Sequence, residues 1–277
     1  MAVEVLCFFL FSSWGFAMAT KTKTAAKDDG GHEIHITPIK QVSMVVHVEG
    51  ESPLIFHRLG RKAQQELLLP SRKKNQAERE TTAKHDPIAE YRESVYLSRD
   101  PRSETALVLQ AATFKSAIRT AALDIPGAAK SQIGRLTYIE GEEVSIFGTQ
   151  EIFITEVRNS GMNRTPDMRT RAIMPKWAAR FVVRFTVPLL SESTVGSLIA
   201  AAGQIIGVGD FRPEKGAGAY GRFSIITEAR FNDIKKVLGG RKEQEAALKE
   251  PQSYDDDTRE LLEWFQKEAG RRSLSIT

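Results

Sequence analysis

A single cysteine, Cys7, occurs among the 277 residues of the chain. Without a second thiol the sequence excludes a disulfide framework, and after its first residues it offers no cysteine-rich zinc site and no cysteine nucleophile. Histidine is scarce too, and none of the five histidines has the i, i+4 spacing of a helical metal site. We therefore expect no metal, no cofactor and a reducing compartment, which is the cytoplasm, or the host cytoplasm if a phage encodes the chain.

Long apolar runs are absent after the first residues, so we expect no membrane partner. Residues 1–17 are apolar and lead into Ala17-Met18-Ala19, which resembles a signal-peptide cleavage site. This segment lacks lysine and arginine and carries Glu4, so we favour an over-extended start with Met18 as the true beginning; a secretory signal is the alternative. Because residues 18–40 are small, polar and charged, we expect 1–40 to form a disordered arm.

Nucleotide-binding motifs are missing, although the chain contains the glycine-rich segment GVGDFRPEKGAGAYG (207–221). A dinucleotide loop follows a strand and opens a helix, whereas this segment is expected to follow a helix and precede a strand. A P-loop needs Ser or Thr after Gly-Lys, and no such residue follows Lys215. Since no serine-nucleophile motif or carboxylate pair is convincing either, we expect a binding protein more than an enzyme.

The hydrophobic periodicity predicts an α+β fold with a ferredoxin-like (RRM-like) βαββαβ core at 41–227. Insertions are expected at 50–105 and 149–172, and a helical tail at 228–277. The predicted strands are 41–48, 134–140, 143–148, 151–157, 176–187 and 220–226, and the predicted helices are 112–123, 193–205 and 257–272. A sheet of this kind carries both core helices on one face and leaves its other face free to bind a partner.

The formal net charge is only +4, so the distribution of the basic residues matters more than their number. Four arginines fall in the polar stretch 158–171, which we expect to be irregular: Arg158, Arg164, Arg169 and Arg171. In strand 176–187, Arg180 and Arg184 alternate with aromatic residues, which places the arginines on the open face of the sheet. Both sets suit a polyanionic partner, and an ordinary solvated loop is an equal alternative for 158–171.

The glycine-rich segment resembles the signature of the RAMP superfamily, the ferredoxin-fold RNA-binding proteins of CRISPR effector complexes, and above all their backbone subunits. The matching residues are Gly207, Gly209, Arg212, Gly216, Gly218, Gly221, Arg222 and Phe223. A second partial match is 106–122, where Lys115 and Arg119 occupy comparable places. Gln110-Ala111-Ala112-Thr113 stands where the family usually has a Pro-Gly-Ser-Ser turn.

The resemblance implies a protein that binds single-stranded RNA or DNA mainly through the backbone, and from the sequence as a whole we favour a phage-encoded, divergent relative of the family. It also implies self-association along the strand, as a filament or in an effector complex. The expected contacts to nucleic acid are Lys115, Arg119, Arg158, Arg164, Arg169, Arg171, Arg180, Arg184, Gly207, Gly209, Arg212, Lys215, Gly216, Gly218 and Arg222. Two alternatives remain open: a metal-independent endoribonuclease with His57 as general acid, and a viral structural or assembly protein.

Overall fold

The computed structural model describes residues 38–69, 75, 83–158, 165–215 and 218–272. The chain divides into two units, Met1–Pro38 and Ile39–Thr277, and every element below belongs to the second. The expected arm at 1–40, including its two alternative starts, lies almost wholly outside the described residues. Two expected contacts, Arg164 and Gly216, lie outside them as well.

The main sheet is antiparallel in all of its pairings and is built around β9, its long central strand. In their order across the sheet the strands are β10 (Phe223–Ile226), β1 (Lys40–Gly50), β9 (Ala178–Val187), β6 (Glu143–Phe147), β4 (Leu107–Gln110) and β3 (Tyr96–Leu97). The short strand β5 (Thr137–Ile139) pairs with β9 beside β6. Together with the helices, this sheet makes the fold α+β, as the sequence predicts.

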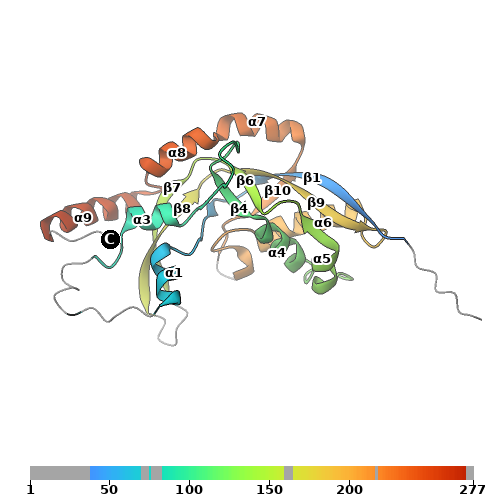
Figure 1. The fold of residues 1–277 in the computed structure, drawn as a ribbon, viewed down its shortest axis with the longest axis horizontal. Helices are drawn as coiled ribbons and strands as arrows, with labels where there is room; N and C mark the ends of the chain where they lie inside the picture. Colours follow the sequence, from blue (N-terminus) through green and yellow to red (C-terminus); the bar gives the residue numbers. More distant parts are fainter. Residues whose placement is uncertain (1–37, 70–74, 76–82, 159–164, 216–217, 273–277) are drawn as a thin grey trace, which may run out of the picture. The chain divides into compact units, whose positions relative to one another are not determined.

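One face of the main sheet is covered by helices from the middle of the chain (Figure 1). These are α4 (Ala111–Ala121), α5 (Lys130–Leu136), α6 (Glu192–Ala201) and the π-helical turn η1 (Ala202–Ile206). Helix α4 buries Phe114, Ala117 and Ile118 at i, i+3, i+4 spacing, so its opposite side is left to solvent. Phe181 and Phe185 of β9 are buried in the same core, as the alternation in this strand predicts.

The predicted strand at 134–140 is wrong in its first half, because α5 ends only at Leu136 and β5 begins at Thr137. Ile133 is buried against the core, and Gly134 lies so close to α4 that an added Cβ would stand 3.0 Å from Cδ of Arg119. The alternation of a short apolar stretch does not distinguish a strand from the last turn of a packed helix.

The other face of the sheet is not free, which corrects the expectation of an open binding face. Helix α7 (Glu228–Leu238) packs on it, and Phe231 lies 4.8 Å from His47 and 5.6 Å from Phe147 between ring centroids. Part of the remaining face is neutralised by ion pairs, since Arg184 lies 3.0 Å from Glu140. The tail was expected to be helical, but its periodicity could not say which surface it would cover.

The two insertions meet in a second, three-stranded sheet in the order β2 (Leu54–Ile55), β8 (Pro166–Met174), β7 (Glu151–Arg158). The stretch 166–171 was expected to be irregular and is instead part of β8, whose inner end is buried against β2. Helices α1 (Arg61–Leu68) and α3 (Pro87–Glu93) come from the first insertion, and α9 (Asp256–Arg272) lies against β7. Because the stretch 158–171 is polar, its sequence did not indicate a strand. Strand β8 pairs with β7 along nearly its whole length and is apolar only at its inner end, where it also pairs with β2.

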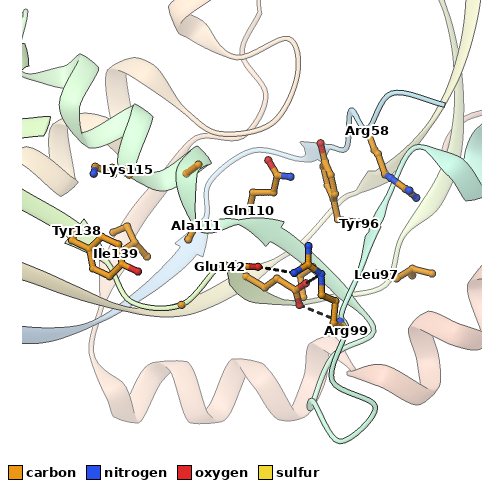
Figure 2. Close-up of a pocket in the computed structure, with 14 residues that line it drawn as sticks. Arg58, Tyr96, Leu97, Arg99, Gln110, Ala111, Lys115, Tyr138, Ile139 and Glu142 are labelled. Atoms are coloured by element: carbon orange, nitrogen blue, oxygen red, sulfur yellow. Dashed lines mark hydrogen bonds and ion pairs between the residues drawn. The ribbon is translucent and has the colours of Figure 1, made fainter. Parts of the chain in front are cut away.

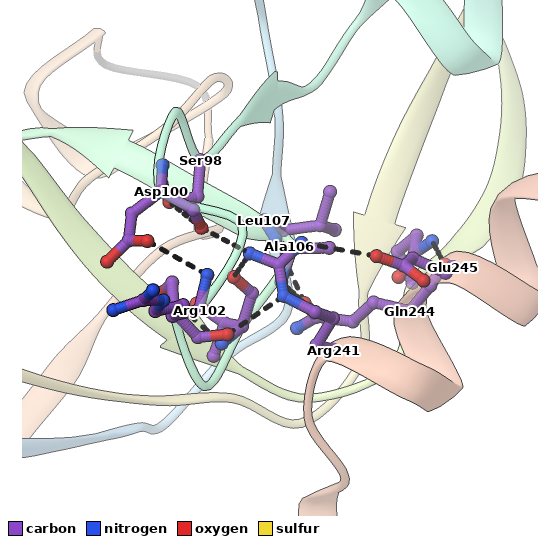
Figure 3. Close-up of polar contacts among 11 residues, drawn as sticks. Ser98, Asp100, Arg102, Ala106, Leu107, Arg241, Gln244 and Glu245 are labelled. Carbon is purple, nitrogen blue, oxygen red and sulfur yellow. Dashed lines mark hydrogen bonds and ion pairs between the residues drawn. The ribbon is translucent and has the colours of Figure 1, made fainter.

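Helix α8 (Arg241–Lys249) joins the tail to the main sheet through a buried polar contact set (Figure 3). The side chain of Gln244 accepts hydrogen bonds from the amides of Ala106 and Leu107 and donates to the carbonyls of Ile146 and Gly148, all at 2.8–2.9 Å. Because all of its hydrogen-bonding capacity is used inside the protein, Gln244 fixes α8 to the strands β4 and β6.

Candidate functional site

A cavity of about 600 Å³ opens at the junction of β4 and α4 (Figure 2). Strand β4 passes directly into the helix, with Gln110 as the residue before its first turn. Gln110 gives no side-chain cap to the helix, and no acidic residue stands in the first turn. The helix start therefore retains the partial positive charge that favours an anion.

Two tyrosines stand at the two ends of this cavity, each with a cation beside its ring (Figure 2). At one end, Nζ of Lys115 lies 5.9 Å from the centre of the Tyr138 ring. At the other end, Cζ of Arg58 lies 6.0 Å from the centre of the Tyr96 ring. Lys115 and Arg58 have no carboxylate partner among the residues that the structure describes, so both charges are available to a ligand.

The two acidic residues at the cavity are both paired with one arginine. Arg99 lies 2.6 Å from Glu142 and 3.5 Å from Glu143, and all three side chains line the cavity. With Arg58 and Lys115 added to Arg99, three positive charges stand against the two glutamates, so the cavity carries one net positive charge. The buried residues Val108, Ala111 and Ile139 supply its apolar part. The combination suits a ligand with a flat aromatic ring and a negative group.

The glycine-rich loop lies on the other side of the same helix turn. A smaller pocket of about 260 Å³ is lined by Ala112 and Thr113 of α4 together with Gly207 and Arg212 of the loop. Ala112 also lines the larger cavity, so the two pockets flank one helix turn. The structure thus brings together the two segments that carry the family resemblance, 106–122 and 207–223, although they are far apart in the sequence.

Several loop amides are used within the protein, which changes their expected role as phosphate ligands. The amides of Val208, Asp210 and Gly221 donate to Gly221, Ile55 and Pro53 carbonyls at 2.8–3.0 Å. Gly221 has a φ of +70°, and an added Cβ would overlap the carbonyl oxygen of Val208. This glycine is required by the close approach of two loop strands, whatever the loop binds.

Two of the cations in and beside the loop, Arg212 and Arg222, are also engaged, unlike those on α4. Arg212 lies 2.5 Å from Glu214 and donates to the Gly209 carbonyl at 2.9 Å. Arg222 lies 3.3 Å from Glu51. A phosphate would have to compete with these carboxylates, so Arg212 and Arg222 are weaker anion sites than free cations of the same exposure. Lys215 is exposed and forms no ion pair with any described residue.

Arg171 is buried where it cannot contact a nucleic-acid strand bound at the protein surface. Its side chain is 4% exposed, pairs with Asp210 of the loop and lies 4.9 Å from the centre of the Phe211 ring. Burial is the main cause that lowers the pKa of this arginine, and Asp210 opposes the effect. The expected phosphate contact by Arg171 does not fit this geometry, which instead makes it an anchor between β8 and the loop.

The other expected contacts are spread over separate surfaces. Arg119 is exposed one turn after Lys115 on α4, and no described carboxylate pairs with it. Arg158 ends β7, Arg169 lies in β8, and Arg180 and Arg184 point from β9 to the face that carries α7. Gly209 and Gly218 lie within the loop, where an added Cβ would overlap neighbouring backbone at Gly218.

His57, the alternative general acid, lies 3.7 Å from Asp210, and burial is the main cause that lowers its pKa. Asp210 is held by Arg171, and no further acid or base of the described chain completes a catalytic set around His57. In the same part of the chain, no group of three or more His, Cys, Asp or Glu side chains is placed to hold a metal ion.

Sequence reasoning missed Arg58, Tyr96 and Tyr138. Tyr138 had a detectable signal, since it is the central residue of the alternating stretch Thr137–Ile139 and its neighbours on both sides are buried. Arg58 and Tyr96 had none, because they come from the first insertion, whose path is set by tertiary contacts.

The comparisons with known proteins add no relative: no protein-family model and no curated protein matches the chain. What can be stated is the class of fold, an α+β protein with a curled antiparallel sheet. Within the described part of the chain, no helix has both the length and the apolar character to cross a membrane.

Proposed function

We propose that this chain is a single-strand nucleic-acid-binding protein, for RNA or single-stranded DNA, that contacts mainly the backbone. The observation that carries the proposal is the exposed side of α4, where Lys115 and Arg119 stand one turn apart without a carboxylate partner among the described residues. Their positions are about 6 Å apart along the helix axis. Two unpaired cations beside the exposed ring of Tyr138 are the combination that binds single strands without reading their sequence.

The fold supports this proposal in its finer form, a RAMP-like protein on a ferredoxin-like core. Strand β9 lies between β1 and the pair β5 and β6, β10 lies outside β1, and all of these pairings are antiparallel. Helix α4 connects β1 to β5 by way of the first insertion, and α6 connects β9 to β10. This strand order is compatible with the split βαβ sheet that we propose. Self-association along the strand and a cytoplasmic location belong to the same proposal.

The direct test is fluorescence anisotropy with labelled oligo-U and oligo-dT as a function of salt. The double variant Lys115→Gln/Arg119→Gln should weaken binding by about tenfold or more at low salt. It should also reduce the slope of log K against log[salt] by about 1.4, since each lost phosphate contact on a single strand contributes about 0.7.

The matched control is Lys242→Gln/Lys267→Gln, which removes the same charge from exposed positions on α8 and α9. Neither control lysine has an ion pair with a described residue, so folding should be unaffected in both double variants. Equal loss in the two would reduce the effect to net charge, and a wild-type protein that binds neither oligomer at low salt would refute the proposal.

A further inference from the structure

We propose that the 600 Å³ cavity at the start of α4 holds one unstacked base of the bound strand, with Tyr138 as its stacking platform. This inference rests on the proposed function and goes beyond it, because backbone binding alone needs no cavity. The ligand class is a nucleotide within a polymer, of which one base enters the cavity and one phosphate stays at its rim.

The first argument is the exposure of Tyr138. Its side chain is 51% exposed although both neighbours, Thr137 and Ile139, are buried. A half-exposed aromatic ring that forms part of a cavity wall can stack on a planar ring at little cost of rearrangement. Base–aromatic stacking contributes about 1–3 kcal/mol per base and tolerates any sequence.

The second argument is the position of charge around the ring. Lys115 lies at the same end of the cavity as Tyr138, on the side of the exposed α4 surface (Figure 2). A strand that follows Lys115 and Arg119 would therefore carry a phosphate to the rim where Tyr138 stands. Arg99 pairs with both Glu142 and Glu143, and Lys115 and Arg58 outweigh the one negative charge that this pairing leaves.

The third argument is the polar group in the middle of the cavity. The side-chain amide of Gln110 lies between Tyr138 and Tyr96 (Figure 2). No described residue forms a hydrogen bond with this side chain. An amide offers both a donor and an acceptor, so it can bond to the edge of any base.

The test compares Tyr138→Ala with Tyr138→Phe in the same anisotropy assay, using strands with and without a run of abasic positions. Tyr138→Ala should lose about 5- to 100-fold in affinity for the normal strand, and Tyr138→Phe should stay close to wild type. On the abasic strand the two variants should bind alike. Photo-crosslinking with 5-iodouridine should label the peptide that contains Tyr138, and thermal melting should show that Tyr138→Ala remains folded.

The outcomes separate the two proposals. If wild type binds no strand at all, the proposed function fails. If it binds and Tyr138→Ala binds equally well, with crosslinks only elsewhere, the base site is overturned while the proposed function stands. Free AMP and UMP form a third arm: weak competition, only at millimolar concentration, agrees with a base site on a polymer. Tight binding of a free mononucleotide that oligomers do not displace would overturn it in favour of a mononucleotide site.

Discussion

At the scale of single residues, the arginines of this chain have different roles that charge alone does not reveal. Lys115 and Arg119 form no ion pair with a carboxylate of the described residues. Arg212 and Arg222 form ion pairs with glutamates. Arg171 is buried and forms an ion pair with Asp210. A free cation can gain a phosphate partner outright, whereas a paired one must exchange partners, and a buried one cannot reach the ligand. Affinity should therefore depend on the α4 cations more than on the loop cations.

Arg171→Met tests the anchoring role of Arg171. Removing one partner of a buried ion pair leaves the other uncompensated, and we expect a loss of about 3 kcal/mol in the free energy of unfolding, measured with urea. The control is Arg222→Gln, whose ion pair is partly exposed and should contribute no more than about 1 kcal/mol. If the two variants unfold at the same urea concentration, Arg171 does not hold the loop.

His85 provides a pH-dependent contact between α3 and β8. It lies 2.7 Å from Glu90 and 3.1 Å from Asp167, and the hydrogen bond to Glu90 is the main cause that raises its pKa. Lys84, 2.5 Å from Asp167, is the main cause that lowers the pKa of that aspartate, which stays ionised near neutrality.

A raised pKa in the folded state means that the stabilisation is complete below about pH 6.5, the ordinary value for histidine, and is lost as the pH rises through the folded pKa. We expect wild type to exceed His85→Gln in stability by about 1 kcal/mol near pH 6. The difference should shrink on the alkaline side in thermal melts at matched ionic strength. A difference that is constant with pH would show that His85 acts by packing alone.

At the scale of elements, the segment from α6 through η1 to the glycine-rich loop is tied to β10 by close backbone approach. Gly203 in η1 lies against the carbonyl of Phe223, where a side chain would overlap the oxygen. Gly196 lies in α6, the helix that precedes η1, and an added Cβ there would have open space around it. The two positions are alike in the sequence, since both are glycines among small residues of a predicted helix, and only the packing distinguishes them.

The pair Gly203→Ala and Gly196→Ala is therefore a matched experiment. We expect Gly196→Ala to stabilise the protein by about 0.5–1 kcal/mol, through higher helix propensity. Gly203→Ala should destabilise it by about 1–3 kcal/mol, because the turn must move away from β10. Urea unfolding measures both, and a gain in stability at both sites would mean that η1 does not rest on β10.

At the scale of the whole molecule, the net charge of +4 says little about where a polyanion would bind. Many cations of the described chain are consumed by ion pairs within and between elements, as in Arg184 with Glu140 and Lys235 with Glu104. The exposed side of α4 and the neighbouring α5 is an exception, with Lys115, Arg119, Lys130 and Arg135 all lacking an ion pair to a described residue. Location, more than total charge, therefore directs the proposed interface.

The sequence by itself determined the α+β class, the core helix α4 and the alternation of buried aromatics with arginines in β9, because each depends on local periodicity. It could also associate Lys115 with the glycine-rich segment through a resemblance. Tertiary structure alone decided that α7 covers the supposed open face, that 166–171 is a strand and that Arg171 is buried. It also assembled Tyr138, Tyr96 and Arg58 around one cavity. These outcomes depend on which surfaces meet across long sequence separations, and no local pattern of side chains records that.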